Sequence, residues 1–330
     1  MNISRQLLSK TGTMLFSTSK SMFLSSFNQF DLTILSKVDN YPLTATVFEP
    51  NKSSICAVIS MATGVNRKYY YSFAQYLCEQ HQILTVCYDY RGVGDSKTNS
   101  NQPPRGADWN IVDWARKDCA SILSYCLDKY SSHDVVTVGH SFGGNIHALM
   151  YSEINRRIKR VLTISSTNSY LGYHKKNLEF LMTLFLLYVF REFSAFFYNY
   201  YAIKTVFKRG ENMPTNIIRQ WAHFCKHKQC FVDKQGNLLF PEAYESLQCP
   251  ILAISFENDR FYKREAFQQF HEQFPNCKIT YRHYKEKYRY GHFNFFRKSK
   301  IDQQLWNECA QFLKDGTIPP EEEIPQIKSK

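Results

Sequence analysis

A serine set between glycines is the strongest chemical signal in the sequence. The run Gly139-His140-Ser141-Phe142-Gly143, followed by Gly144, comes directly after a predicted buried strand at 134–138 and directly before a predicted helix. A sharp turn from strand to helix holds such a serine in an unfavourable backbone conformation, so the flanking positions must lack bulk. The pattern predicts that Ser141 is the nucleophile of an acyl-transfer reaction.

A serine hydroxyl needs a base, and the base needs an acid to orient it, in the chain order Ser, Asp or Glu, His. His292 lies in a loop between the last predicted strand and the closing helix, and it is the predicted base. Asp259 follows a buried strand and is the predicted acid, with Glu257 as the alternative. A surface histidine and a carboxylate that caps a loop are the structural alternatives for these positions.

An acyl-transfer site also needs two backbone N–H groups to hold the oxyanion. One is expected from Phe142, the residue after the nucleophile, and one from the loop that follows the predicted strand 55–60. In that loop Thr63 is the first candidate and Gly64 the second, because small residues let the backbone approach a substrate. An ordinary turn glycine is the alternative.

The elements that must position these residues alternate between strand and helix, which predicts an α/β fold with a mostly parallel sheet covered on both faces. Leu43–Phe48 is expected to be an edge strand. The further predicted strands are 55–60, 83–88, 134–138, 160–165, 250–256 and 278–283, and the predicted helices are 69–80, 111–130, 143–152, 263–274 and 301–314.

Residues 168–246 interrupt this alternation and are predicted to be an inserted lid within a hydrolase domain at 28–315. The stretch Leu178–Ile203 is helical in composition and apolar almost all round, so it must bury both faces or present one to an apolar ligand or membrane. We expect Leu178–Phe190 to line an acyl pocket and to favour medium or long acyl esters. Residues 1–27 are predicted to be a tail or a targeting segment, and residues 316–330 a solvated tail.

The composition indicates a folded globular protein, with 44% hydrophobic and 16% aromatic residues among 330. The sequence has no run of eighteen consecutive apolar residues, so a membrane-spanning protein is not expected. The ten cysteines are scattered and form no C-x-x-C pair, which indicates reduced thiols. The predicted location is therefore cytoplasmic, with a mitochondrial location as the alternative because the N-terminus is basic and rich in serine.

The net charge of +12 comes largely from 278–300, where eight Lys or Arg face the single acid Glu286. Such a run either forms a solvated face or attracts anionic substrates or lipid surfaces. In the second case the protein would contact a membrane peripherally. The sequence has no recognisable nucleic-acid motif, so no nucleic-acid partner is expected. The cluster His223, Cys225, His227 and Cys230 matches no common zinc spacing, and neither a metal nor a cofactor is expected.

Four segments together resemble the α/β-hydrolase superfamily, and in particular its predicted-hydrolase group near the serine aminopeptidase and monoglyceride lipase branch. The resemblance covers about residues 28–314 and implies the same nucleophile, acid and base. It implies that Asp89 and Arg91 hold a loop. The sequence departs from the family pattern at Met61-Ala62, where His-Gly is usual. The segments are Ala62-Thr63-Gly64-Val65, Tyr88–Ser96, Gly139–Gly144, and Gly291-His292-Phe293 with Phe296-Arg297.

The sequence thus predicts a serine hydrolase, similar to a lipase or esterase, that cleaves carboxylic esters through an acyl-enzyme. The expected substrate is a small-molecule or lipid-like ester. A serine peptidase or thioesterase of the same fold is the alternative, as is a catalytically silent ligand-binding protein. The oligomeric state stays open.

Overall fold

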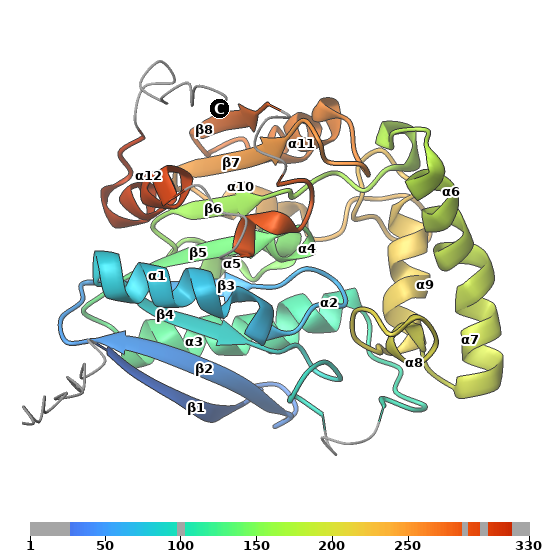
Figure 1. Ribbon diagram of the computed structural model, residues 1–330, viewed down its shortest axis with the longest axis horizontal. Coiled ribbons are helices and arrows are strands. Elements are labelled where there is room, and N and C mark those ends of the chain that lie inside the picture. The colour runs from blue at the N-terminus through green and yellow to red at the C-terminus, as the bar shows by residue number, and fades with distance from the viewer. Residues whose placement is uncertain (1–26, 98–102, 286–289, 298–302, 319–330) are drawn as a thin grey trace, which may run out of the picture.

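The computed structural model describes residues 27–97, 103–285, 290–297 and 303–318. Within them an eight-stranded sheet has the order β1-β2-β4-β3-β5-β6-β7-β8 (Figure 1). β1 pairs with β2 and β2 with β4 in antiparallel fashion, and every later pair is parallel. The strands are β1 (Phe27–Leu35), β2 (Pro42–Pro50), β3 (Ile55–Ser60), β4 (Leu84–Tyr88), β5 (Asp134–His140), β6 (Val161–Ile164), β7 (Ile251–Phe256) and β8 (Ile279–Tyr284).

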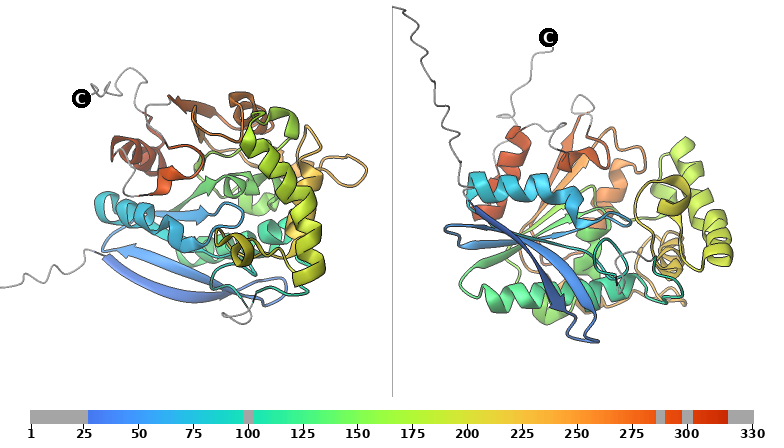
Figure 2. Two further views of the ribbon diagram at one scale, coloured as in Figure 1. Left: turned by 45° about the vertical axis from the view of Figure 1, so that its right-hand side comes forward. Right: turned by 60° about the horizontal axis from the view of Figure 1, so that its bottom comes forward.

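Helices pack on both faces of this sheet (Figures 1 and 2). The predicted α/β architecture is therefore confirmed. α1 and α12 contact each other on one face of the sheet, and α3 and α5 contact each other on the opposite face (Figure 2). The bounds are α1 (Tyr71–His81), preceded by η1 (Arg67–Tyr70), a continuous helix of α2 (Ile111–Asp113), η2 (Trp114–Cys119) and α3 (Ala120–Lys129), then α5 (Ser152–Asn155), α11 (Arg264–His271) and α12 (Gln303–Asp315).

The core lies in the central strands, because both faces of the sheet are covered. Every residue of β3, β4 and β7 is buried, as expected for parallel strands between two helical layers. All ten cysteines are free thiols, and nine of them are buried.

Three details differ from the sequence prediction. β2 is not an edge strand, because β1 covers its outer side. β1 was not predicted, since most of its side chains are exposed and its sequence mixes polar and apolar residues. The predicted helix 143–152 is also wrong: the chain turns through α4 (Phe142–Asn145) and η3 (Ile146–Leu149) and becomes extended at Met150.

The chain between β6 and β7 forms further helices (Figure 1). We call Leu178–Tyr198 the outer helix, because it runs along the edge of the molecule farthest from the sheet (Figure 2). Its parts are α6 (Leu178–Leu184), η5 (Phe185–Phe190) and α7 (Arg191–Tyr198), and it is followed by α8 (Ile203–Phe207), α9 (Thr215–Phe224) and α10 (Pro241–Ser246). Of these helices, α6 to α9 lie at the carboxyl ends of the strands, and α10 packs against α5 and η3.

In the described part of the chain, the outer helix alone is long and apolar enough to cross a membrane by length and composition. One such helix is weak evidence for a membrane span. The predicted tails lie almost wholly outside the described residues: Phe27 begins β1, and of 316–330 the structure describes 316–318.

A buried arginine holds the start of η1 to the loop after β4. The Arg67 guanidinium contacts the Asp89 carboxylate at 2.5 Å and Asp95 at 2.7 Å, and the backbone N–H of Arg67 also donates to Asp89. Arg91 makes a similar buried pair with Asp118 at 2.7 Å. Asp89 and Arg91 therefore hold this loop, as the resemblance implied.

We expect Arg67→Met to lower the free energy of unfolding by about 3–5 kcal/mol, because the fully buried Asp89 would lose its counter-charge. Lys68→Met is the matched control. Lys68 pairs with the same Asp95 but both side chains are largely exposed, so the loss should be about 1 kcal/mol or less. Urea unfolding of the two variants measures the difference, and equal losses would contradict this account.

Candidate active site

Ser141 lies at the turn between β5 and α4 in a strained conformation with a positive φ of 52° and a ψ of −118°. This turn can pack closely against the sheet because Gly139, Gly143 and Gly144, two residues before Ser141 and two and three after it, carry no side chains. A Cβ atom at Gly143 would overlap the backbone carbonyl of Ser60, and one at Gly139 would overlap the backbone of Gly144. A Cβ at Gly144 would overlap the Ser166 side chain. The three glycines are therefore needed for close approach of backbone segments.

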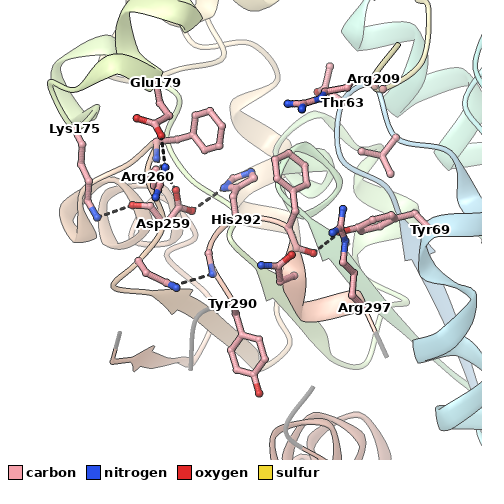
Figure 3. Close-up of a pocket in the computed structure, with 18 of the residues that line it drawn as sticks. Thr63, Tyr69, Lys175, Glu179, Arg209, Asp259, Arg260, Tyr290, His292 and Arg297 are labelled. Carbon is pink, nitrogen blue, oxygen red and sulfur yellow. Dashed lines mark hydrogen bonds and ion pairs between the residues drawn. The ribbon is translucent and has the colours of Figure 1, made fainter. Parts of the chain in front are cut away.

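The three side chains predicted to act together form one hydrogen-bonded line. The Oγ of Ser141 lies 3.0 Å from Nε2 of His292. Nδ1 of His292 lies 2.7 Å from Oδ2 of Asp259 (Figure 3). With Nδ1–H donating to the carboxylate, Nε2 is left as an acceptor for the serine proton. The arrangement can therefore perform base-assisted attack by the hydroxyl.

Asp259 is fully buried at the end of β7. Burial by itself raises the pKa of this carboxyl, but His292 and the backbone N–H groups of Phe261 and Tyr262 outweigh it, and the net pKa is lowered. The group therefore stays ionised. Glu257, the alternative acid, lies on the exposed side of the same loop, and its backbone N–H donates to Tyr284.

The loop that carries the base is fixed at three consecutive residues by partners from three different segments. The N–H of Gly291 donates to the Asn258 side chain at 2.8 Å. The backbone carbonyl of His292 accepts a hydrogen bond from His140 at 2.8 Å, and that of Phe293 accepts one from Tyr69 at 2.6 Å. The position of the base thus depends on side chains that the sequence did not single out.

His140 also connects the base to the oxyanion loop. Its Nδ1 lies 2.8 Å from the Tyr70 hydroxyl, which accepts the backbone N–H of Ala62 at 2.8 Å. Burial, and then the neighbouring His292, lowers the pKa of His140 to about 3. A neutral His140 can donate from Nε2 to the His292 carbonyl while Nδ1 accepts from Tyr70.

The two predicted oxyanion donors are in the elbow and in the loop after β3. Phe142 is the first residue of α4, so its N–H has no acceptor within the helix. Ala62 already donates to Tyr70, which leaves Thr63 as the next backbone donor in its loop. The Thr63 hydroxyl is buried without a hydrogen-bond partner in the described residues, and Thr63 lines the pocket beside His292.

The acid loop is attached to the start of the insertion by polar contacts (Figure 3). The Lys175 ammonium donates to the backbone carbonyls of Asp259 at 2.6 Å and Glu257 at 2.8 Å. Arg260 pairs with Glu179 of α6 at 2.8 Å. The insertion therefore helps to hold Asp259, the predicted acid, in place.

A pocket of about 1650 Å³ opens beside His292 and Asp259. Its walls are mixed, with charged side chains next to the aromatic rings of Tyr69, Phe261 and Phe293. In the stretch Leu178–Phe190, which the structure describes throughout, the pocket-lining residue is Glu179. The expectation that apolar side chains of this stretch line an acyl pocket is wrong for this pocket. Some of these side chains, such as Leu178 and Phe185, are exposed to solvent, and others, such as Leu187, are buried against the protein.

Among the described residues, no three His, Cys, Asp or Glu side chains are grouped so that they could hold a metal ion. In the cluster considered from the sequence, Cys225 and Cys230 are buried thiols, and the His223 ring hydrogen-bonds the backbone carbonyl of Asp233.

Comparisons with known proteins agree with this architecture. A family model described as the alpha/beta hydrolase fold matches residues 61–211, a span that includes Ser141 and ends before the acid and the base. No sequence among the curated proteins matches the chain significantly. The sheet, the elbow and the family match together identify the fold as that of the α/β hydrolases.

Solved structures share this fold at low sequence identity. A thermostable carboxyl esterase from Bacillus coagulans, in complex with glycerol, has a TM-score of 0.60 at 13% identity, over 86% of this chain and 97% of its own. The Pyrococcus furiosus esterase Pf2001 has a TM-score of 0.52 at 15% identity, over 88% and 91%. DcsB, in complex with its substrate analogue, has a TM-score of 0.60 at 12% identity, over 88% and 100%.

The two candidate acids can be separated by mutation. Asp259→Asn should lower kcat by several orders of magnitude, because an amide can hold the imidazole in the wrong tautomer. Glu257→Gln should lower it only mildly, because this side chain lies on the exposed side of the loop. Steady-state kinetics on a p-nitrophenyl ester measures both, and the opposite order would show that the acid is Glu257.

Proposed function

We propose that the protein is a serine hydrolase that cleaves carboxylic esters. The observation that carries the proposal is the hydrogen-bonded line from Ser141 through His292 to Asp259, with Ser141 in the strained elbow conformation. The family match to the alpha/beta hydrolase fold and the esterases among the structural neighbours support a hydrolase.

In the proposed cycle, Nε2 of His292 takes the hydroxyl proton as Ser141 attacks the ester carbonyl. Asp259 stabilises the imidazolium that forms, and the N–H groups of Phe142 and Thr63 hold the oxyanion. The imidazolium then protonates the leaving alcohol, and an acyl-enzyme remains on Ser141. Water, deprotonated by His292, releases the carboxylic acid and restores the enzyme.

A peptidase or thioesterase would use the same residues, so the bond that is cleaved must be found with substrates. A catalytically silent ligand-binding protein has no need of this hydrogen-bonded line. Ser141, His292 and Asp259 are each held in place by separate contacts. That all three are nevertheless aligned for acyl transfer favours an enzyme. Activity on p-nitrophenyl esters, acyl thioesters and aminoacyl p-nitroanilides, compared under the same conditions, separates the three reactions.

The helices between β6 and β7 act as a lid in this proposal. α6 to α9 lie at the carboxyl ends of the strands, where hydrolases of this fold have their sites. The polar side chains that this region contributes to the pocket are those of Lys175, Asn177, Glu179, Arg209 and Glu211. Because the pocket is lined by charged groups as well as rings, it favours an ester with polar groups near the scissile bond.

Ser141→Ala should abolish labelling by a fluorophosphonate probe and lower ester turnover by at least about a thousandfold, because no other group can form the acyl-enzyme. Gel fluorescence measures labelling, and p-nitrophenyl butyrate measures turnover. Unchanged thermal unfolding would show that the variant is folded.

Ser165→Ala is the matched control. Ser165 also follows a parallel strand, has a positive φ of 52°, and has a buried hydroxyl without a partner in the described residues. Labelling should persist in this variant. If a folded Ser141→Ala variant still labels, or if Ser165→Ala alone loses labelling, the nucleophile is not Ser141.

A further inference from the structure

The outer helix presents a largely apolar face to solvent, interrupted by Glu192. Only 17% of the most apolar 18-residue stretch of this helix is buried. A helix on the surface of a soluble domain normally exposes polar side chains instead. Phe196 is 83% exposed and Leu178 is 74% exposed. The exposed apolar residues recur every three or four positions and so share one side of the helix. They are Leu178, Leu181, Met182, Phe185, Val189, Phe193, Phe196 and Phe197.

The opposite side of the same helix is fixed to the protein. Leu187, Phe190 and Ser194 are buried, and the Tyr188 hydroxyl donates to a backbone carbonyl of α9. Phe207 of α8 packs against Phe190, with ring centres 5.0 Å apart, and Val206 and Phe207 are themselves partly exposed. The outward orientation of the apolar face is therefore set by packing on its inner side.

Cationic side chains flank this face at both ends. Lys176 lies before α6, with its ammonium 3.7 Å from the centre of the Phe180 ring, and Arg105 lies over the ring of Tyr200 just beyond α7. Lys208 and Arg209 follow α8 and are exposed.

Within the ranges that the structure describes, these four cations carry no carboxylate partner, although the Lys176 and Lys208 ammonium groups each donate one hydrogen bond to a backbone carbonyl. By contrast, the neighbouring Lys204 and Arg260 pair with Glu211 and Glu179. The one carboxylate on the outer side of the outer helix, Glu192, is paired with Arg219 at 3.3 Å. Apolar residues flanked by unpaired cations match the chemistry of an anionic lipid surface.

We propose that the outer helix and the end of α8 dock the protein on the surface of an anionic phospholipid bilayer. The helix lies in the plane of the interface, its apolar side chains enter the boundary between headgroups and acyl chains, and the cations contact lipid phosphates. This docking goes beyond the proposed hydrolase activity and does not depend on it.

The helix does not cross the membrane in this arrangement. Both of its ends return to the same domain: His174 bridges to Tyr262 beside the acid loop, and Tyr201 bridges to Met213 before α9. A single crossing would place these two anchors on opposite sides of the bilayer. It would also pull the buried side chains Leu187 and Phe190 away from the protein.

Docking would place the pocket next to the lipid. Lys175, Asn177 and Glu179 at the start of the outer helix line the pocket from one side, and Arg209 and Gly210 after α8 line it from another. The same two segments carry the docking face and frame the pocket, so a lipid-borne substrate would meet both.

Flotation of the full-length protein with phosphatidylcholine vesicles, with and without phosphatidylserine, tests the proposal. The protein should float with the anionic vesicles and less with the neutral ones, and salt should weaken the binding. Phe196→Ser/Phe197→Ser should weaken binding to anionic vesicles at least about tenfold, because two exposed rings no longer enter the interface. Lys176→Gln/Lys208→Gln should reduce the preference for phosphatidylserine.

Leu35→Ser/Val38→Ser is the matched control, because these two residues are similarly exposed but lie at the β1–β2 turn. It should bind as the unchanged protein does. Thermal unfolding and turnover of a soluble short-chain ester, measured on every variant, separate a docking defect from misfolding or from failure of the proposed function.

The proposal is overturned if the unchanged protein does not bind anionic vesicles, or if the Phe196/Phe197 variant binds them equally well. A dimer in analytical ultracentrifugation that this variant dissociates would also overturn it, since a second copy would then cover the face.

Discussion

The close approach of backbone to backbone at the nucleophile elbow is the constraint on which the site depends. Ser141 can hold its strained, positive-φ conformation because Gly139, Gly143 and Gly144 leave no Cβ atoms against β3, β6 and the turn itself. This packing aims the hydroxyl at His292 and leaves the Phe142 N–H without a helical acceptor. One steric requirement thus positions both the nucleophile and one donor for the developing negative charge.

The acid and the base are held by contacts between segments that are far apart in the sequence. Lys175 joins the insertion to the Asp259 loop, and His140 joins the elbow to the backbone of His292. The insertion therefore has two faces with different chemistry: polar side chains point toward the pocket, and the apolar face of the outer helix points away from it. A charged pocket beside an apolar outer surface is consistent with an enzyme that works at an interface.

The local features of this protein could be predicted from its sequence, and the chain order of Ser141, Asp259 and His292 predicted that these three would meet. The contacts that support them could not be predicted. The elbow and the central strands have short patterns of residue type that follow from sterics and burial. β1 has no such pattern, because it is an exposed edge strand with mixed polarity. Which side chains of the outer helix face the solvent depends on what packs against its inner side. Apolar composition alone therefore led to a wrong expectation for the pocket wall. The supporting residues bond backbone groups of distant loops, which leaves no spacing signal. They are Tyr69, Tyr70, Lys175 and Asn258.

The central claim is that Ser141 forms a covalent acyl-enzyme with assistance from His292. Its most direct test is acid quenching of the reaction with a p-nitrophenyl ester during the first turnover, followed by peptide mass spectrometry. The account predicts one acyl group per protein, located on Ser141, and no such adduct in a folded His292→Ala variant. An acyl group on another residue, or turnover without any acyl-enzyme in a quench series that spans the first turnover, would contradict the account.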